Sequence, residues 1–128
     1  MPKSVGWNGT GSNGTVGHGL NAAPSVVIVK NRDDNTKGWP FQFTDLGNNY
    51  LEINNGSNTF TGSTYFQNTA PTSTVFSVGS IGSTNASGDK MIAYCFAEVD
   101  GFFKVGKYNG NSSNMFIYCG FKPALIVI

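Results

Sequence analysis

Runs of apolar and β-branched residues, separated by turn residues, recur along the chain. Pro24 opens one run at residues 25–30, a short run covers 50–53, and residues 72–79 alternate between two sets of side chains. Alternation with a period of two indicates a strand, because successive side chains of a strand point to opposite faces. Each run therefore predicts a β-strand.

The clearest strand candidate covers residues 90–99. Its odd-numbered positions point one way, and Ile92, Tyr94 and Phe96 point the other way. Apolar side chains on both faces are typical of a central strand that is covered on both sides. Three further runs are also predicted strands: residues 101–108, 114–119 and 124–128.

Turn signals separate these runs by about eight to twelve residues, which is the spacing of a sandwich or barrel. We expect the glycines of five pairs to supply the positive φ of tight hairpins: Asn8-Gly9, Asn13-Gly14, Asn55-Gly56, Asp100-Gly101 and Asn109-Gly110. No stretch has a helical period, so no helix longer than one turn is predicted. We predict one all-β domain over residues 1–128, an antiparallel, jelly-roll-like β-sandwich of about nine strands without substantial helix.

Residues 108–128 echo residues 7–29. The shared order is an aromatic residue, Asn-Gly, Gly followed by an apolar residue, Pro and an apolar run, with one short gap between the two copies. Self-similarity of this kind is typical of repeated structural units. The chain therefore reads as one unit followed by the opening hairpin of the next.

The second copy ends in an entirely apolar segment, residues 124–128. Period-two alternation puts apolar side chains on both of its faces, so both faces require cover. We expect the segment to pair as a strand within the sandwich near residues 26–29, or to add to the sheet edge of a neighbouring subunit. The predicted assembly residues are Leu125, Ile126, Val127 and Ile128.

Charge and length exclude several functions. The chain has 128 residues, a net charge of +1 and 12% charged residues, and Arg32 is its one arginine. Nucleic-acid binding requires clustered cations, so it is not expected. No run approaches the roughly 18 apolar residues of a membrane span, and the N-terminus lacks the apolar stretch of a signal peptide. We expect no membrane insertion, and synthesis in the cytoplasm.

The candidate catalytic motifs favour structural interpretations. Residues 9–14 match G-x-G-x-x-G, but the glycine-rich sequence that follows cannot form the helix of a dinucleotide site. His18, the one histidine, lies between glycines and is predicted to be exposed, without a recognisable nucleophile beside it. The sequence predicts no catalytic residue and no cofactor.

The carboxylates also favour structural roles. Glu98 and Asp100 are neighbours at a strand end and read as a solvated rim, because glycosidase carboxylates flank a substrate from opposite sides. Residues 33–35 lack the Gly and the bidentate Glu of an EF-hand loop, and a loop turn is the favoured interpretation. No metal site is predicted.

Two groups of side chains remain. Cys95 and Cys119 are predicted to be buried, reduced thiols in strands, with a cross-strand disulfide as the less favoured alternative.

Aromatic rings among Asn, Ser and Thr are typical of carbohydrate sites, where a ring stacks on a sugar face. The candidate carbohydrate-binding residues are Trp7, Trp39 and Tyr65.

Several segments carry a resemblance to a known family. They are Pro24 to Arg32, Asn68 to Gly79, Asn85 to Asp89, Ala93 to Phe102, and Gly106 to Asn111 leading to Gly120 to Ala124. Together they resemble a tandem-repeat β-sandwich domain of unknown function in virion structural and tail-fibre-like proteins of tailed, often marine, bacteriophages. The pattern departs from that family over residues 33–49, where a longer insert is compressed.

The resemblance implies a β-sandwich without enzymatic activity and supplies no catalytic residues. We expect a virion structural protein, either a capsid decoration protein or a head or tail fibre subunit, that forms a homo-oligomer and contacts other virion proteins. It would be made in the host cytoplasm and end in the virion. The alternative hypothesis is a lectin-like module that binds surface glycans for adhesion.

Overall fold

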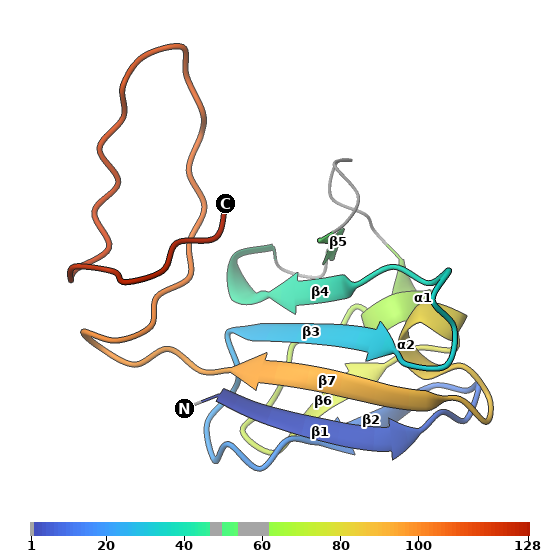
Figure 1. The fold of residues 1–128 in the computed structure, drawn as a ribbon. Helices are drawn as coiled ribbons and strands as arrows, with labels where there is room; N and C mark the ends of the chain where they lie inside the picture. The colour runs from blue at the N-terminus through green and yellow to red at the C-terminus, as the bar shows by residue number, and fades with distance from the viewer. Residues whose placement is uncertain (1, 47–49, 54–61) are drawn as a thin grey trace.

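The strands form two antiparallel sheets. The computed structural model describes residues 2–46, 50–53 and 62–128. The larger sheet has the order β1-β7-β3-β4-β5 and the smaller sheet pairs β2 with β6 (Figure 1). The strand bounds are β1 Pro2–Asn8, β2 Gly14–Gly17, β3 Val26–Asn31, β4 Pro40–Phe43, β5 Leu51–Glu52, β6 Val75–Val78 and β7 Lys90–Phe96.

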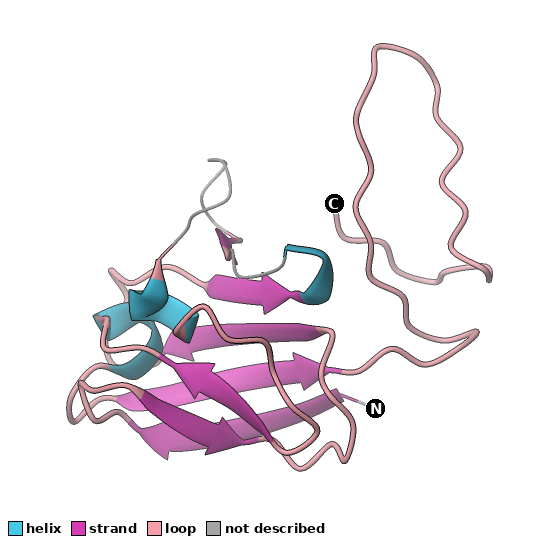
Figure 2. Cartoon of the chain, turned by 180° about the vertical axis from the view of Figure 1, so that it is seen from behind, coloured by secondary structure: helices cyan, strands magenta, loops and turns pink. Residues whose placement is uncertain are grey.

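The helices are single turns. They are α1 Ser63–Phe66, α2 Gly82–Asn85 and the 3-10 helix η1 Thr44–Leu46. The prediction of an all-β fold without substantial helix is confirmed for the described residues (Figure 2). None of the helices in this part of the chain has the length and apolar character needed to cross a membrane.

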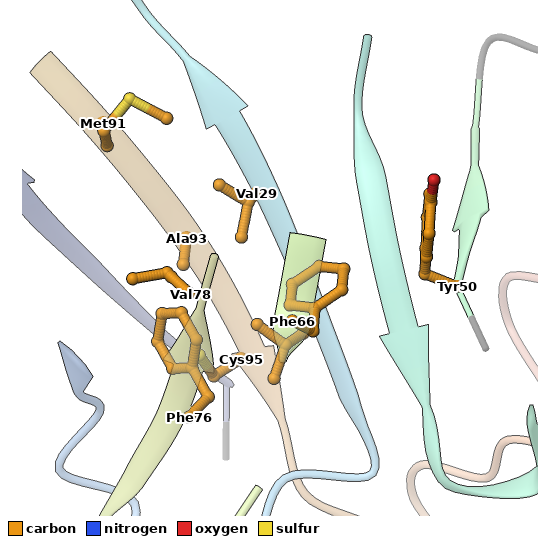
Figure 3. Close-up of a cluster of buried hydrophobic side chains, with 9 residues drawn as sticks. Val29, Tyr50, Phe66, Phe76, Val78, Met91, Ala93 and Cys95 are labelled. Carbon is orange, nitrogen blue, oxygen red and sulfur yellow. The ribbon is translucent and has the colours of Figure 1, made fainter. Parts of the chain in front are cut away.

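The core lies between the two sheets. Register places Val27 opposite Cys95 and Val29 opposite Ala93, so these side chains share the inner face of the larger sheet. Phe76 of β6 packs on them, and all five side chains are fully buried. Figure 3 shows how strands β3, β6 and β7 and helix α1 converge on this cluster.

The prediction for residues 90–99 is confirmed in part. Strand β7 is central, between β1 and β3, as its apolar character indicated. However, the outer face of β7 is not fully covered, because Tyr94 is 37% exposed and Ile92 and Phe96 are half-buried. The second apolar face of this strand is therefore a surface.

Three predicted strands are wrong for the single chain. Residues 101–108, 114–119 and 124–128 form no strands, and the described residues contain seven strands in two sheets rather than nine. After β7, the described residues have one isolated β-bridge, which pairs Val99 with Phe103. A strand requires a hydrogen-bonded partner as well as an apolar pattern, and the two sheets do not extend to these residues.

Most Asn-Gly pairs do not act as predicted. Gly101 has the expected positive φ of 72°, whereas Gly9, Gly14 and Gly110 do not have positive φ, and Asn55-Gly56 lies outside the described residues. Position 9 requires glycine for a different reason, because a Cβ there would overlap the carbonyl oxygen of Ala86. Close approach of two loops, rather than turn geometry, requires this glycine.

Candidate functional site

Trp7 is a structural residue at the edge of the core. Its indole Nε1 donates to Asn85 Oδ1 at 3.1 Å, and its ring meets Phe76 edge-on with centroids 5.9 Å apart. Asn85 is buried, and its amide also donates to Thr10 Oγ1 and to the Ser12 carbonyl. Asn85 therefore fixes the loop after β1, a role for which its sequence context carried no distinctive signal.

The other two aromatic candidates have different surroundings. Tyr65 stacks on Tyr50, with ring centroids 3.9 Å apart, and packs against the core. Trp39 is 37% exposed and has Lys30 Nζ 5.8 Å from its ring centroid. Trp7, Tyr65 and Trp39 are therefore held by different neighbours, and the structure does not gather them around one hollow.

His18 is buried, so the expectation of an exposed histidine is wrong. Its exposed fraction is 4%, and the Leu20 backbone N–H donates to Nδ1 at 3.2 Å. Because Nδ1 accepts, the other nitrogen carries the proton, and Nε2 donates to the Thr72 carbonyl at 3.0 Å. Nδ1 thus holds the loop after β2 to itself, and Nε2 joins that loop to the loop before β6.

Glu98 stabilises the turn after β7. Its carboxylate accepts from the Val105 backbone N–H at 3.0 Å and pairs with Lys104 Nζ at 3.2 Å. The Val105 hydrogen bond, followed by the contribution of Lys104, lowers the pKa of Glu98 below its ordinary value. This carboxylate is occupied in holding a turn at the surface.

The Asp33 and Asp34 carboxylates stabilise the loop after β3. Asp34 Oδ1 accepts from the backbone and hydroxyl of Thr36, and these bonds lower the pKa of Asp34. Asp33 Oδ2 accepts from the Lys90 backbone N–H at 2.8 Å. Within residues 2–46, 50–53 and 62–128, no three His, Cys, Asp or Glu side chains are grouped to hold a metal ion.

The two thiols occupy different environments. Cys95 is fully buried on the inner face of β7, and burial raises its pKa to about 11. Cys119 is half-buried outside any strand, with Sγ 3.0 Å from the Phe121 carbonyl oxygen, so its prediction as a buried strand residue is wrong. Both thiols are free.

An apolar surface, which we call the outer face, covers the side of the larger sheet away from the core. Register pairs Ile28 with both Tyr94 and Phe41, and it pairs Val26 with Phe96. The outer face consists of Val26, Ile28, Phe41, Ile92, Tyr94 and Phe96. The same register also places the buried Phe43 and the half-buried Lys30 on this side of the sheet. Phe103 stacks on Phe96 at 5.4 Å between centroids and covers one corner.

A second apolar surface belongs to residues 108–128, which we call the arm. The arm projects from the sheets in both views (Figures 1 and 2). Leu125 is 81% and Ile128 93% exposed, and Phe116 is 88% exposed. Burial of residues 124–128 within the chain's own sandwich is therefore wrong. The other expectation, addition to a neighbouring subunit, stays a prediction.

The composition of these two surfaces is unusual for a free surface, because large contiguous apolar patches on soluble proteins mark interaction sites. The predicted assembly residues lie on one of them. The outer face was missed, although the apolar second faces of residues 25–30 and 90–99 were its signal. The sequence prediction has those faces covered by other parts of the same chain.

Comparison with known proteins places the chain in a family. A family model described as a domain of unknown function (DUF7483) matches residues 3–128, and the chain belongs to that family. The match spans the sheets and the arm, so the arm is part of the family's domain rather than an appended tail. No curated protein and no solved structure matches the chain.

Proposed function

We propose that this DUF7483 domain is a non-enzymatic structural protein of a bacteriophage particle, either a capsid decoration protein or a subunit of a head or tail fibre. The observation that carries the proposal is the amount of apolar surface left open, on the outer face and on the arm. Such surface is stable in water only when association covers it. The resemblance to virion domains supplies the setting in which that association takes place.

A non-enzymatic role is consistent with how the reactive side chains are used. The imidazole of His18 is bonded at both nitrogens, and the carboxylate of Glu98 holds Lys104 and a backbone N–H. These are the groups that general acid or base chemistry would require to be available. Here their contacts support loops and turns.

Assembly would also complete the architecture. The seven strands leave the outer face open, and the arm carries two apolar segments at residues 115–118 and 125–128. If both segments become strands in the assembled protein, the seven strands of the described residues rise to about nine, the number expected from the sequence. The partners are other copies of the chain and other virion proteins, and the protein resides in the virion after synthesis in the host cytoplasm.

Mass spectrometry of purified particles tests the proposal. The expected result is this chain at a fixed stoichiometry to a known capsid or tail protein, retained after density-gradient purification. A host cytoplasmic protein followed through the same gradient is the control for contamination. Absence of the chain from pure particles would overturn the proposal, and imaging of labelled protein on particles would locate it.

A lectin-like function is the second candidate, and the exposed ring of Trp39 is the observation that favours it. Lys30 donates to the Lys37 and Asp34 carbonyls and so sits fixed above this ring. A glycan array of the chain and of Trp39→Ala tests the idea, with Trp7→Phe as a control for loss of an aromatic residue elsewhere. Equal or absent glycan binding by the parent chain and Trp39→Ala would remove it.

A further inference from the structure

The arm has the sequence of strands that already exist in this fold. The echo aligns Tyr108 with Trp7 at the end of β1, residues 115–118 with β2, and residues 125–128 with the first four residues of β3. Those segments of the first copy are all hydrogen-bonded into sheets. The arm therefore carries one apolar segment, residues 125–128, with the pattern of the start of β3, and a second, residues 115–118, at the place of β2. Neither segment lies in a strand in the single chain.

The arm cannot take the places of its sequence relatives in its own chain. β2 occupies the position beside β6, and β3 occupies the position between β7 and β4. The chain's own outer face is open, yet the arm lies extended and exposed instead of packing on it. Its anchor at the sheet is the 99–103 turn, where Phe103 stacks on Phe96.

We propose that the arm of one copy packs on the outer face of a second copy of this chain, with residues 115–118 and 125–128 as the strands of the new layer. This inference deepens the proposed assembly function and rests on it. The proposed partner is a second copy because both apolar surfaces belong to this chain, and each surface can bury the apolar side chains of the other. Every copy supplies one arm and one acceptor face.

The dimensions and chemistry of the two surfaces agree. A four-residue strand extends roughly 13 Å, and the six- and seven-residue strands β3 and β7 extend roughly 20 to 23 Å, so each arm strand fits on the outer face. The outer face offers Ile28, Tyr94 and Phe41 at its centre. The arm offers Phe116 and Val127, both more than four-fifths exposed. Two lysines, Lys30 and Lys90, alternate onto the same side of the sheet as Ile92, and Lys30 Nζ already donates to the Asp34 and Lys37 carbonyls.

Directed disulfide formation between two chains tests the contact. One chain carries Tyr94→Cys and a second, of different mass, carries Val127→Cys, both in a Cys119→Ser background. Cys95 remains, and its full burial keeps it out of the reaction. The expected result is a mixed disulfide between the two chains under mild oxidation, detected by its mass without reductant.

The matched control moves the acceptor cysteine to the other layer. Ser73→Cys is exposed in the turn that leads to β6, in the smaller sheet. Mixed with the Val127→Cys chain, it should form at least tenfold less mixed disulfide than Tyr94→Cys. Equal cross-linking at both sites would overturn the inference, as would a disulfide found solely within a chain that carries both Tyr94→Cys and Val127→Cys.

Solution mass provides an independent readout. The full chain should have at least twice the mass of one chain in light scattering, and deletion of residues 124–128 or the change Tyr94→Lys should shift it toward monomer. Ser73→Lys should leave the mass unchanged. An oligomer that survives both changes would overturn the arm contact while leaving the assembly function standing. Absence of the chain from virions would overturn the virion assignment and leave the cross-link result intact.

Discussion

Residues 7–29 and residues 108–128 have nearly the same pattern but different structures. The first stretch forms the end of β1, all of β2 and the start of β3, and it supplies Val27 and Val29 to the core and packs Trp7, Val16 and Leu20 against it. The second stretch is extended and exposed. The patterns agree, so the difference comes from partners: β7 and β6 lie beside the first copy, and no strand lies beside the second among the described residues.

This contrast separates strand propensity from strand formation. Apolar alternation makes a segment suited to a pleated, covered surface, but the stabilisation comes from neighbouring strands and packed faces. Aligned positions of the two copies can therefore be changed one at a time. A substitution at one position should then have different effects in the two copies.

Gly9 and Gly110 are aligned in the two copies and should differ most. Gly9→Ala places a Cβ against the Ala86 carbonyl oxygen, whereas a Cβ at Gly110 meets open space. Because backbone must move to accept the methyl group, we expect Gly9→Ala to lower the free energy of unfolding by about 3 kcal/mol. Gly110→Ala should change it by less than about 0.5 kcal/mol. Urea unfolding measures both, and equal effects would contradict the contrast.

Val29 and Ile128 are the next aligned pair. Val29 is fully buried in the core, and truncation to Ala removes two methyl groups, so Val29→Ala should cost about 2 kcal/mol of unfolding free energy. Ile128 is 93% exposed, and Ile128→Ala should leave the stability of the monomer unchanged within about 0.5 kcal/mol. The measurement is made at a concentration where light scattering finds monomer. A destabilised Ile128→Ala monomer would mean that the arm packs on its own chain.

The apolar runs at residues 25–30 and 90–99 correctly predicted two neighbouring strands of the larger sheet, β3 and β7. β3 and β7 were predictable because both faces of each are apolar, and such runs suit few positions except central ones. β4 was missed because it has four residues and its pattern is reversed: polar Gln42 faces inward and donates to the Thr69 carbonyl, while Phe41 faces outward. Alternation of apolar and polar residues places the phenylalanines inward, so it could not predict this orientation.

The candidate site was predictable in part. The apolar character of Leu125 to Ile128 predicts an assembly segment, since no solvated position suits them, and the structure leaves these residues exposed. The aromatic candidates were chosen by residue type, which does not distinguish a ring that borders the core, like Trp7, from an exposed one, like Trp39. The outer face is open because no layer of the described residues covers that side of the larger sheet, which is a property of the whole topology rather than of any segment.

The reactivity of the two thiols distinguishes the larger sheet, which contains Cys95, from the arm, which contains Cys119. The raised pKa of Cys95, about 11 instead of 9, leaves roughly 100-fold less thiolate at neutral pH, and burial blocks access as well. Cys119, half-buried in the arm, should react with maleimide in the native protein, while Cys95 should react after denaturation. Mass spectrometry of the labelled peptides distinguishes them. Protection of Cys119 that increases with protein concentration would indicate that association covers the arm.

The smallest expected effect lies at Glu98, in the turn that joins β7 to the arm. Its pKa is lowered in the folded chain, chiefly by the Val105 backbone hydrogen bond and then by Lys104. A lowered folded pKa means that the stabilisation is present above the unfolded pKa and is lost as pH falls through the folded value, which lies below the ordinary range of a glutamate. Because the pair is exposed, solvent screening keeps the effect local, and the sheets should stay folded.

The Val105 amide resonance, followed by NMR from pH 6 to 2, should shift with the titration of Glu98. In Glu98→Gln this titration should vanish. An unchanged Val105 titration in that variant would show that another carboxylate holds the turn.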